Sequence, residues 1–291
     1  MISKWTEKHT YDLMVAPLIL FIIIMVAFPL AYTVYLSFTD WTMGTTAPQF
    51  LGLANYKDVL TDKQFWADTG HTLYLAFGSV LIELILGTLI AVILNRPFVG
   101  KDVVKTLFLL PMVATPIAVG MVWQLIYEPT LGVANYLLKF LGIDPVLWLV
   151  DSKLVLNSLI IIEVWEWTPM VMLIVLAGLA GMPHDIYESA QVDGANRFQL
   201  FWKVTLPMLR PTLIVTALLR LIDALKTFDI IYATTRGGPL QASETVNLLA
   251  YNSIFSYFKM GRGAALIICF LAEIGLCCAL IMMLRRKAKE Y

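Results

Sequence analysis

Apolar residues in this chain are grouped in long, nearly uninterrupted stretches. A helix needs about 20 mostly apolar residues to cross the roughly 30 Å hydrocarbon core of a bilayer. Six stretches reach that length, at 13–38, 73–94, 103–127, 154–179, 212–234 and 264–284. The pattern therefore predicts an all-α integral membrane protein with six transmembrane helices.

Two of the six stretches are less regular than the others. The fifth is interrupted by four charged residues, Arg220, Asp223, Lys226 and Asp229. The first resembles a secretory signal in its position, but it is longer than the apolar core of a signal, which runs about 7–15 residues. It also lacks a clear small-x-small cleavage site. We therefore expect a retained helix at 13–38.

Composition supports a membrane protein and excludes several other classes. Hydrophobic residues make up 59% of the chain and charged residues 14%, against about half and about a quarter in soluble domains. The formal net charge is zero, so no nucleic-acid partner is indicated. The three cysteines all fall in the last apolar stretch and the three histidines are scattered. We expect neither a disulfide framework nor a metal site.

Basic residues indicate which side of the membrane each connection faces, because loops rich in Lys and Arg stay in the cytoplasm. One side has twelve: Lys4, Lys8, Arg96, Lys101, Lys105, Arg197, Lys203, Arg210, Arg285, Arg286, Lys287 and Lys289. The other side has seven: Lys57, Lys63, Lys139, Lys153, Arg236, Lys259 and Arg262. We therefore expect cytoplasmic segments at 1–12, 181–211 and 285–291, and an outer loop at 39–72.

The cytoplasmic loop 181–211 contains an unusual set of helix signals. Asp185 precedes Glu188 by three residues, as in a capping box that begins a helix. Gly194 suits the left-handed residue that closes a helix. Asn196 suits the cap of a second short helix, which Pro207 would stop. Two short helices on a glycine hinge, with apolar side chains exposed, are typical of a surface for a partner protein.

The same loop resembles the coupling loop of bacterial ABC importer permeases, which reads E-A-A-x3-G-x9-I-x-L-P. This chain has Glu188-Ser189-Ala190, then three residues and Gly194, and then nine residues and Val204-Thr205-Leu206-Pro207. It departs from the pattern at Ser189 and Val204. The alternative is an ordinary amphipathic connection. The resemblance implies that seven residues couple the chain to an ATP-hydrolysing subunit: Glu188, Ser189, Ala190, Asp193, Gly194, Leu206 and Pro207.

Weaker matches elsewhere resemble the carbohydrate branch of this family, the maltose- and glycerol-phosphate-type permeases, and the first of their two paired subunits. The most specific of them is the stretch 228–232 followed by Thr235-Arg236-Gly237-Gly238-Pro239. The resemblance implies a type I importer permease fold, with a permease core at 73–284, in a bacterial plasma (inner) membrane. It also implies a second permease subunit, two ATPase subunits and an extracytoplasmic solute-binding protein as partners.

No stretch of the sequence matches the phosphate-binding motif G-x-x-x-x-G-K-[ST]. We therefore expect a permease that is not an enzyme and has no catalytic residues. ATP and Mg would be bound by the ATPase subunits, and this chain would have no cofactor of its own.

Charged side chains inside the spans indicate where a solute passes, because charges in a bilayer are costly and usually functional. Arg220, Asp223 or Ala224, and Thr227 follow helical spacing on the fifth span, and Glu166 and Met170 do so on the fourth. The resemblance to maltose-type permeases implies solute contacts at Glu166, Trp167, Met170, Arg220, Ala224 and Thr227. Asp223, which shares the helical face of Arg220 and Thr227, is a further candidate solute contact. A sugar site needs groups that bind hydroxyls and a flat apolar face.

The sequence alone leaves several features of this candidate site undecided. The amide-rich contacts of the family are missing, which permits an anionic sugar held by Arg220. The structural alternative is that Arg220 pairs with Asp223, and Lys226 with Asp229, only to neutralise charge. We expect two other in-span acids, Glu83 and Glu273, to face polar neighbours.

Two other functions fit parts of the sequence. A proton-coupled secondary transporter would use in-span carboxylates such as Glu163, Glu166 or Asp223. It would be expected to have inverted repeats and broken helices, and the sequence has no internal repeat. An intramembrane enzyme would use Asp223 with Asp229, but six residues of helix make them face away from each other.

Overall fold

The structure is a computed structural model that describes residues 12, 14–44 and 48–289. Every regular element within those ranges is helical, apart from two isolated β-bridges. The predicted all-helical fold class is therefore confirmed. Residues 1–11 of the predicted cytoplasmic N-terminus and residues 290–291 of the predicted tail lie outside the described residues.

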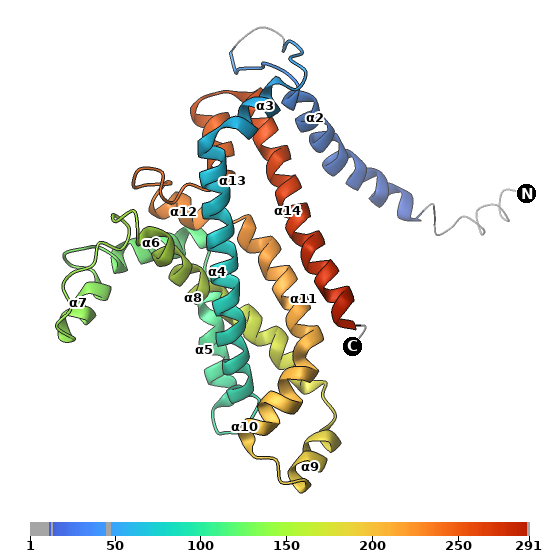
Figure 1. Cartoon of the computed structure of the whole chain (residues 1–291), viewed down its shortest axis with the longest axis vertical. Helices are drawn as coiled ribbons and strands as arrows, with labels where there is room; N and C mark the ends of the chain where they lie inside the picture. The colour runs from blue at the N-terminus through green and yellow to red at the C-terminus, as the bar shows by residue number, and fades with distance from the viewer. Residues whose placement is uncertain (1–11, 13, 45–47, 290–291) are drawn as a thin grey trace, which may run out of the picture. The chain divides into compact units, whose positions relative to one another are not determined.

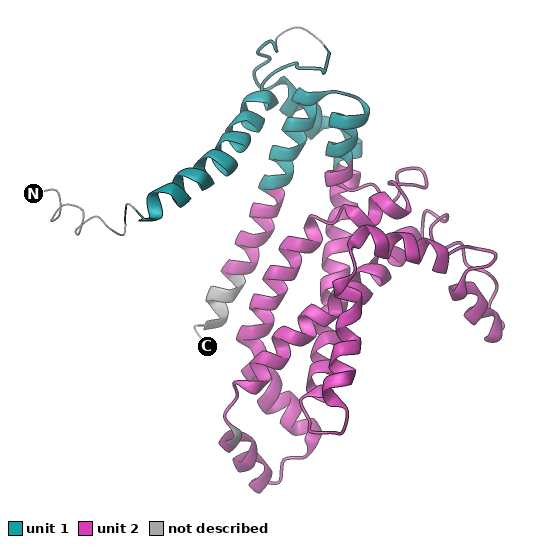
Figure 2. Ribbon diagram, turned by 180° about the vertical axis from the view of Figure 1, so that it is seen from behind, with its two compact units in different colours: residues 1–65, 249–272 teal, residues 66–248, 273–291 magenta. Residues whose placement is uncertain are grey.

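The chain divides into two compact units, which are described separately (Figure 2). Unit 1 comprises Met1–Phe65 and Leu249–Ala272, and unit 2 comprises Trp66–Leu248 and Glu273–Tyr291. Two long helices, α4 (Lys63–Leu94) and α14 (Met260–Lys289), each contribute residues to both units.

Unit 1 contains the first long helix, Met14–Ser37. This helix includes the π-helix η1 (Ile23–Ala27) and α2 (Phe28–Ser37). Unit 1 also contains α3 (Ala54–Thr61), the π-helix η3 (Asn252–Ser256) and the starts of α4 and α14. Asn55 donates to the carbonyl oxygens of Ser37 and Thr39 at 2.9 and 2.7 Å. Arg262 pairs with Asp58 at 2.7 Å and also with Asp62. These polar contacts join the end of the first long helix to α3, and α3 to α14.

Unit 2 is built around α8 (Val155–Ala180), which packs against α4 and against four other helices of this unit. Those helices are α5 (Lys101–Val113), α6 (Pro116–Ile126), α11 (Leu206–Leu225) and α12 (Asp229–Thr234). The remaining elements are α7 (Val133–Phe140), α9 (His184–Val192), α10 (Arg197–Leu200), the π-helix η2 (Phe201–Thr205) and the first three residues of α13 (Val246–Tyr251), whose other three residues belong to unit 1. Figure 1 shows α4 and α11 as two long helices, and residues of both pack into one buried apolar cluster.

A close approach of α4 to α8 depends on a glycine. A Cβ added at Gly87 would lie 2.6 Å from Val171 Cγ1 and 3.0 Å from the backbone nitrogen of Met172. Ala91 and Leu94, one and two turns further along α4, pack into the same buried cluster as Val171 and Met172. Small side chains at a helix contact let the two backbones come close, as is common between membrane helices.

The predicted third span is bent rather than straight. Its stretch 103–127 forms α5 and α6, whose axes differ by 96° across the break at Ala114 and Thr115. Pro116 explains the break, because the residue before a proline is driven out of the helical region. Thr115 accordingly has an extended backbone, with φ −72° and ψ 139°.

The prediction of one continuous helix over 212–234 is wrong. The helix α11 ends at Leu225, three residues separate it from α12, and Phe228 has a non-helical backbone. By length and composition, the described residues contain four helices that could cross a membrane, or five if α5 and α6 count as one. The charged fifth stretch is not among them.

Candidate functional site

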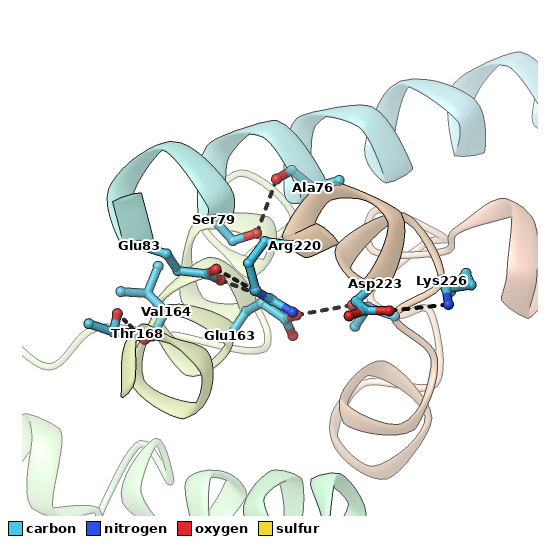
Figure 3. Close-up of polar contacts among 10 residues, drawn as sticks. Ala76, Ser79, Glu83, Glu163, Val164, Thr168, Arg220, Asp223 and Lys226 are labelled. Atoms are coloured by element: carbon cyan, nitrogen blue, oxygen red, sulfur yellow. Dashed lines mark hydrogen bonds and ion pairs between the residues drawn. The ribbon is translucent and has the colours of Figure 1, made fainter. Parts of the chain in front are cut away.

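Three helices of unit 2 bring one basic and two acidic side chains together in the interior. Arg220 of α11 lies between Glu83 of α4 and Glu163 of α8 (Figure 3). Its Nε donates to Glu83 Oε2 at 2.7 Å and its Nη2 donates to Glu163 Oε1 at 3.2 Å. All three residues are buried. Burying an isolated charge is very costly, so each of these groups depends on the others.

The pairing of charges differs from both pairs considered from the sequence. Arg220 does not pair with Asp223, because its side chain points toward α4 and α8. Asp223 instead pairs with Lys226 at 3.2 Å, and both of these side chains are about half exposed. The suggested Lys226–Asp229 pair is therefore also wrong. The expectation that Glu83 and Glu273 face polar neighbours is confirmed, since Glu273 accepts a hydrogen bond from Thr69 at 2.9 Å.

A cavity of about 140 Å³ opens beside the ion-pair cluster. Of the predicted solute contacts, Trp167, Arg220, Asp223 and Thr227 line it. The other lining residues, which sequence reasoning did not place in the site, are Pro116, Glu163, Lys226, Phe228, Asp229 and Ile230. The spacing of Glu163, Trp167 and Met170 on one face of α8 could have indicated Glu163. Asp229 reaches the cavity only because the helix breaks before it.

Three predicted contacts do not line this cavity. Glu166 is fully buried on α8, one turn from Glu163, and Met170 is partly buried one further turn along the same helix. Ala224 packs into an apolar cluster with Ala76, Val80 and Leu221. The geometry therefore favours an apolar packing role for Ala224 and leaves Glu166 beside the cavity rather than in its wall.

Two polar atoms near the cavity have no hydrogen-bond partner in the described part of the chain. They are Nη1 of Arg220 and Oε2 of Glu166. The Arg220 guanidinium also lies over the ring of Trp167, 4.7 Å from its centroid. Thr227, at the break between α11 and α12, donates to Glu163 Oε1 at 3.2 Å. The site thus holds one unpartnered donor and one unpartnered acceptor, both buried, next to the Trp167 ring.

The loop that resembles a coupling loop contains the predicted first short helix, whereas the predicted second short helix is only the first turn, α10, of a longer helical segment. The first, α9, is followed by Gly194 with a left-handed backbone at φ +81°. Ala195 N donates back to Ala190 O at 3.0 Å, which closes the helix. Asp185 does not cap α9, because the N-cap is Pro183 and Asp185 lies within the first turn. A carboxylate in that turn still favours the helix through the macrodipole.

The second short helix begins at a complete capping box. Asn196 accepts from Gln199 N and Gln199 accepts from Asn196 N, each at 2.9 Å. The expected stop at Pro207 is wrong. The chain continues without interruption through η2 into α11, and Pro207 lies inside this segment directly after the π-helical turn Phe201–Thr205. A local π-helical adjustment lets a helix tolerate the N–H that a proline lacks. One helical segment therefore runs from Arg197 to Leu225 and carries Leu206, Pro207 and Arg220.

Long apolar helices that enclose a buried charge cluster, a small polar cavity and a break in one helix define an all-helical membrane permease. A sequence model described as "Binding-protein-dependent transport system inner membrane component" matches residues 83–286. The chain belongs to this family. It is therefore a multi-pass inner membrane protein and the permease component of a transport system, which is not itself catalytic.

Similar proteins cover most of this chain. The probable ABC transporter permease protein y4oQ of Sinorhizobium fredii is 42% identical over 246 residues, 84% of this chain and 79% of that protein. The trehalose/maltose transport system permease protein MalF of Thermococcus litoralis is 39% identical over 259 residues, 89% and 86% of the two chains. The trehalose transport system permease protein SugA of Mycobacterium tuberculosis is 34% identical over 267 residues, 91% and 84%.

A solved structure has the same fold. A chain in the crystal structure of a bacterial alginate ABC transporter in complex with an alginate pentasaccharide-bound periplasmic protein superposes with a TM-score of 0.86. The match covers 98% of this chain and 97% of that one, at 22% sequence identity. At that level of identity the similarity supports the fold and does not extend to the solute.

Proposed function

We propose that this chain is one of two paired permease subunits of an ABC importer for a sugar, and the first of the pair. Relatives named for trehalose and maltose transport support a sugar as the solute. The observation that carries the proposal is the single helical segment from Arg197 to Leu225. It joins a loop with the coupling-loop spacing to Arg220, which lines the interior cavity.

The proposed topology has six spans with both termini in the cytoplasm. In it, α5 and α6 together form the third span, and α11 and α12 form the fifth. A helix broken near the middle of a membrane is tolerated where the break lines a cavity rather than lipid. Thr227 and Phe228 at the break do line the cavity, which supports this assignment.

A neutral sugar fits the cavity better than an anionic one. Arg220, which sequence alone permits as the holder of an anion, already has two carboxylate partners. The lining contains three acids, Glu163, Asp223 and Asp229, and two bases, Arg220 and Lys226. An added negative charge would meet more repulsion than attraction. The hydroxyl groups of a neutral sugar can instead bond to the polar groups of the lining, and the apolar face of its ring can pack against the Trp167 side chain.

The proposed cycle needs partner chains. In it, the exposed loop around Gly194 contacts an ATPase subunit that binds ATP and Mg, and a second permease completes the solute path. An extracytoplasmic protein delivers the solute. The alginate transporter, whose structure contains a solute-bound periplasmic protein, provides a structural parallel.

Gentle solubilisation of the tagged chain from its native host, followed by mass spectrometry, tests this proposal. We expect a second membrane permease and an ATPase with a phosphate-binding motif to co-purify. Recovery of this chain alone, stable and of one size, would contradict it. Uptake that follows a proton gradient without ATP would instead favour a secondary transporter that uses Glu163, Glu166 or Asp223.

A further inference from the structure

A second cavity, of about 500 Å³, lies in unit 2 apart from the ion-pair cluster. Its walls come from the end of α4 and the turn after it, the end of α8, and the segment from α9 to η2. None of the residues that line the first cavity lines this one. It is therefore a separate candidate site, placed next to the loop that contains Gly194.

The charged residues that line this second cavity are all basic. Two arginines line it, Arg96 after α4 and Arg197 at the start of α10, and no acidic residue does. Both are exposed, and neither has an ion pair within the described part of the chain. Arg220 and Arg262, by contrast, each have two carboxylate partners. Two uncompensated guanidinium groups at one cavity attract an anion.

The rest of the lining limits what kind of anion fits. Asn95 and Gln191 add side-chain amides that can donate hydrogen bonds, and Leu179 and Phe201 provide an apolar wall. A guanidinium group matches phosphate through paired N–H donors. We propose that this cavity binds the phosphate group of an organic anion, either the headgroup of an anionic phospholipid or a free phosphate compound from the cytoplasm.

An occupant of this cavity would touch the loop that contains Gly194. Tyr187 of α9 donates to Thr205 Oγ1 of η2 at 3.1 Å, and both residues line the cavity. Arg96 lies on a different segment, after α4. A bound phosphate that contacts Arg96 and Arg197 together therefore fixes the α9–η2 region to the end of α4. A regulatory effect on transport would rest on the proposed function, whereas the binding itself does not.

Binding measurements on the purified full-length chain, with whatever partners co-purify, test the site. One arm uses nanodiscs with and without phosphatidylglycerol and detects retained lipid by native mass spectrometry. The other uses phosphatidylcholine nanodiscs and titrates inorganic phosphate by calorimetry. Specific binding in the first arm identifies a lipid headgroup as the ligand, and binding in the second identifies a soluble phosphate.

Matched variants make the result specific. Because each basic residue near an anionic headgroup contributes about 1 kcal/mol, Arg96→Gln and Arg197→Gln should each weaken binding about fivefold. Lys203→Gln removes the same charge from η2 but lies outside the cavity lining, so it should leave binding unchanged. Absence of binding in both arms would overturn the proposal. Equal weakening by Lys203→Gln would also overturn it, because it would indicate general surface attraction.

Discussion

Arg220 Nε and Glu83 Oε2 lie 2.7 Å apart in the interior of unit 2, although 137 residues separate them in the sequence. Removing one partner of such a pair leaves an uncompensated buried charge, which typically costs about 3–5 kcal/mol. We therefore expect Arg220→Met to lower the stability of the solubilised protein by about that amount. Thermal unfolding in detergent measures the change.

A matched control for this variant is Lys226→Met, at the C-cap of α11. Lys226 pairs with Asp223 in a half-exposed position, where an ion pair contributes at most about 1 kcal/mol. Unfolding temperatures should therefore separate the two variants clearly. Equal losses would show that the buried cluster does not have the energetic role that its geometry indicates.

Trp167 provides the aromatic face of the proposed solute cavity. Trp167→Ala should weaken solute affinity about tenfold, because an aromatic stacking contact of about 1–1.5 kcal/mol is lost. Uptake into proteoliposomes at varied solute concentration measures this. Trp165→Ala is the control, since Trp165 is two residues away on α8, 44% exposed, and packs against Trp123 rather than lining the cavity. A similar loss in that variant would argue against the assignment.

Gly87 lets α4 and α8 approach closely. Gly87→Ala should destabilise the protein by about 1–3 kcal/mol, because the new methyl group would overlap Val171. Gly70→Ala, on the same helix, meets no atom within 4 Å and should be neutral or stabilising by up to about 1 kcal/mol. Chemical or thermal unfolding of the two variants compares them directly. A neutral Gly87→Ala would mean that this contact is looser than described.

Gly194 has a left-handed backbone in the loop that we propose to contact the ATPase. Gly194→Asp should leave the protein inserted in the membrane and abolish uptake. Gly142→Asp is a close control, since Gly142 also has a positive φ, +71°, and open space around its Cα, but lies after α7. Immunoblots of membranes measure insertion, and uptake assays measure transport. Normal uptake with Gly194→Asp would contradict the coupling role.

Glu128 lies in the exposed turn after α6. Its carboxylate accepts hydrogen bonds from the backbone of Leu131 and from Thr130, and these bonds lower the pKa of Glu128 from its ordinary 4.5. A lowered pKa means that this turn is stabilised above about pH 4.5 and loses that stabilisation as pH falls through the lower folded value. The Leu131 amide signal in an NMR titration should change with a midpoint below 4.5. Glu128→Gln should abolish the transition.

Local signals in the sequence predicted part of this structure. The apolar stretch 154–179 corresponds to α8, and the left-handed Gly194 and the Asn196 cap occur as expected, because each depends on residues next to it. The predicted stop at Pro207 is wrong because the π-helical turn Phe201–Thr205 directly before it lets the helix continue past the proline. A local signal can therefore indicate the correct kind of structure but place its boundary at the wrong residue.

Contacts between residues that are far apart in the sequence could not be predicted from such local signals. Spacing along one helix suggested an ion pair between Arg220 and Asp223, whereas the carboxylate partners of Arg220 come from α4 and α8. The breaks at 114–115 and 226–228 likewise decide which side chains reach the cavity. Six spans were expected from apolar length, but charge at the fifth stretch makes its membrane placement depend on what surrounds it.

The helical segment from Arg197 to Leu225 has no coil residue, so we propose that it works as a lever between the loop and the ion-pair cluster. At 1.5 Å per residue, about 35 Å of helix separates Arg197 from Arg220. If the segment moved as one piece, a tilt of about 5° would displace its far end by about 3 Å, which is as long as a hydrogen bond. A small movement of the loop would then be enough to change the distance from Arg220 to Glu83 and Glu163.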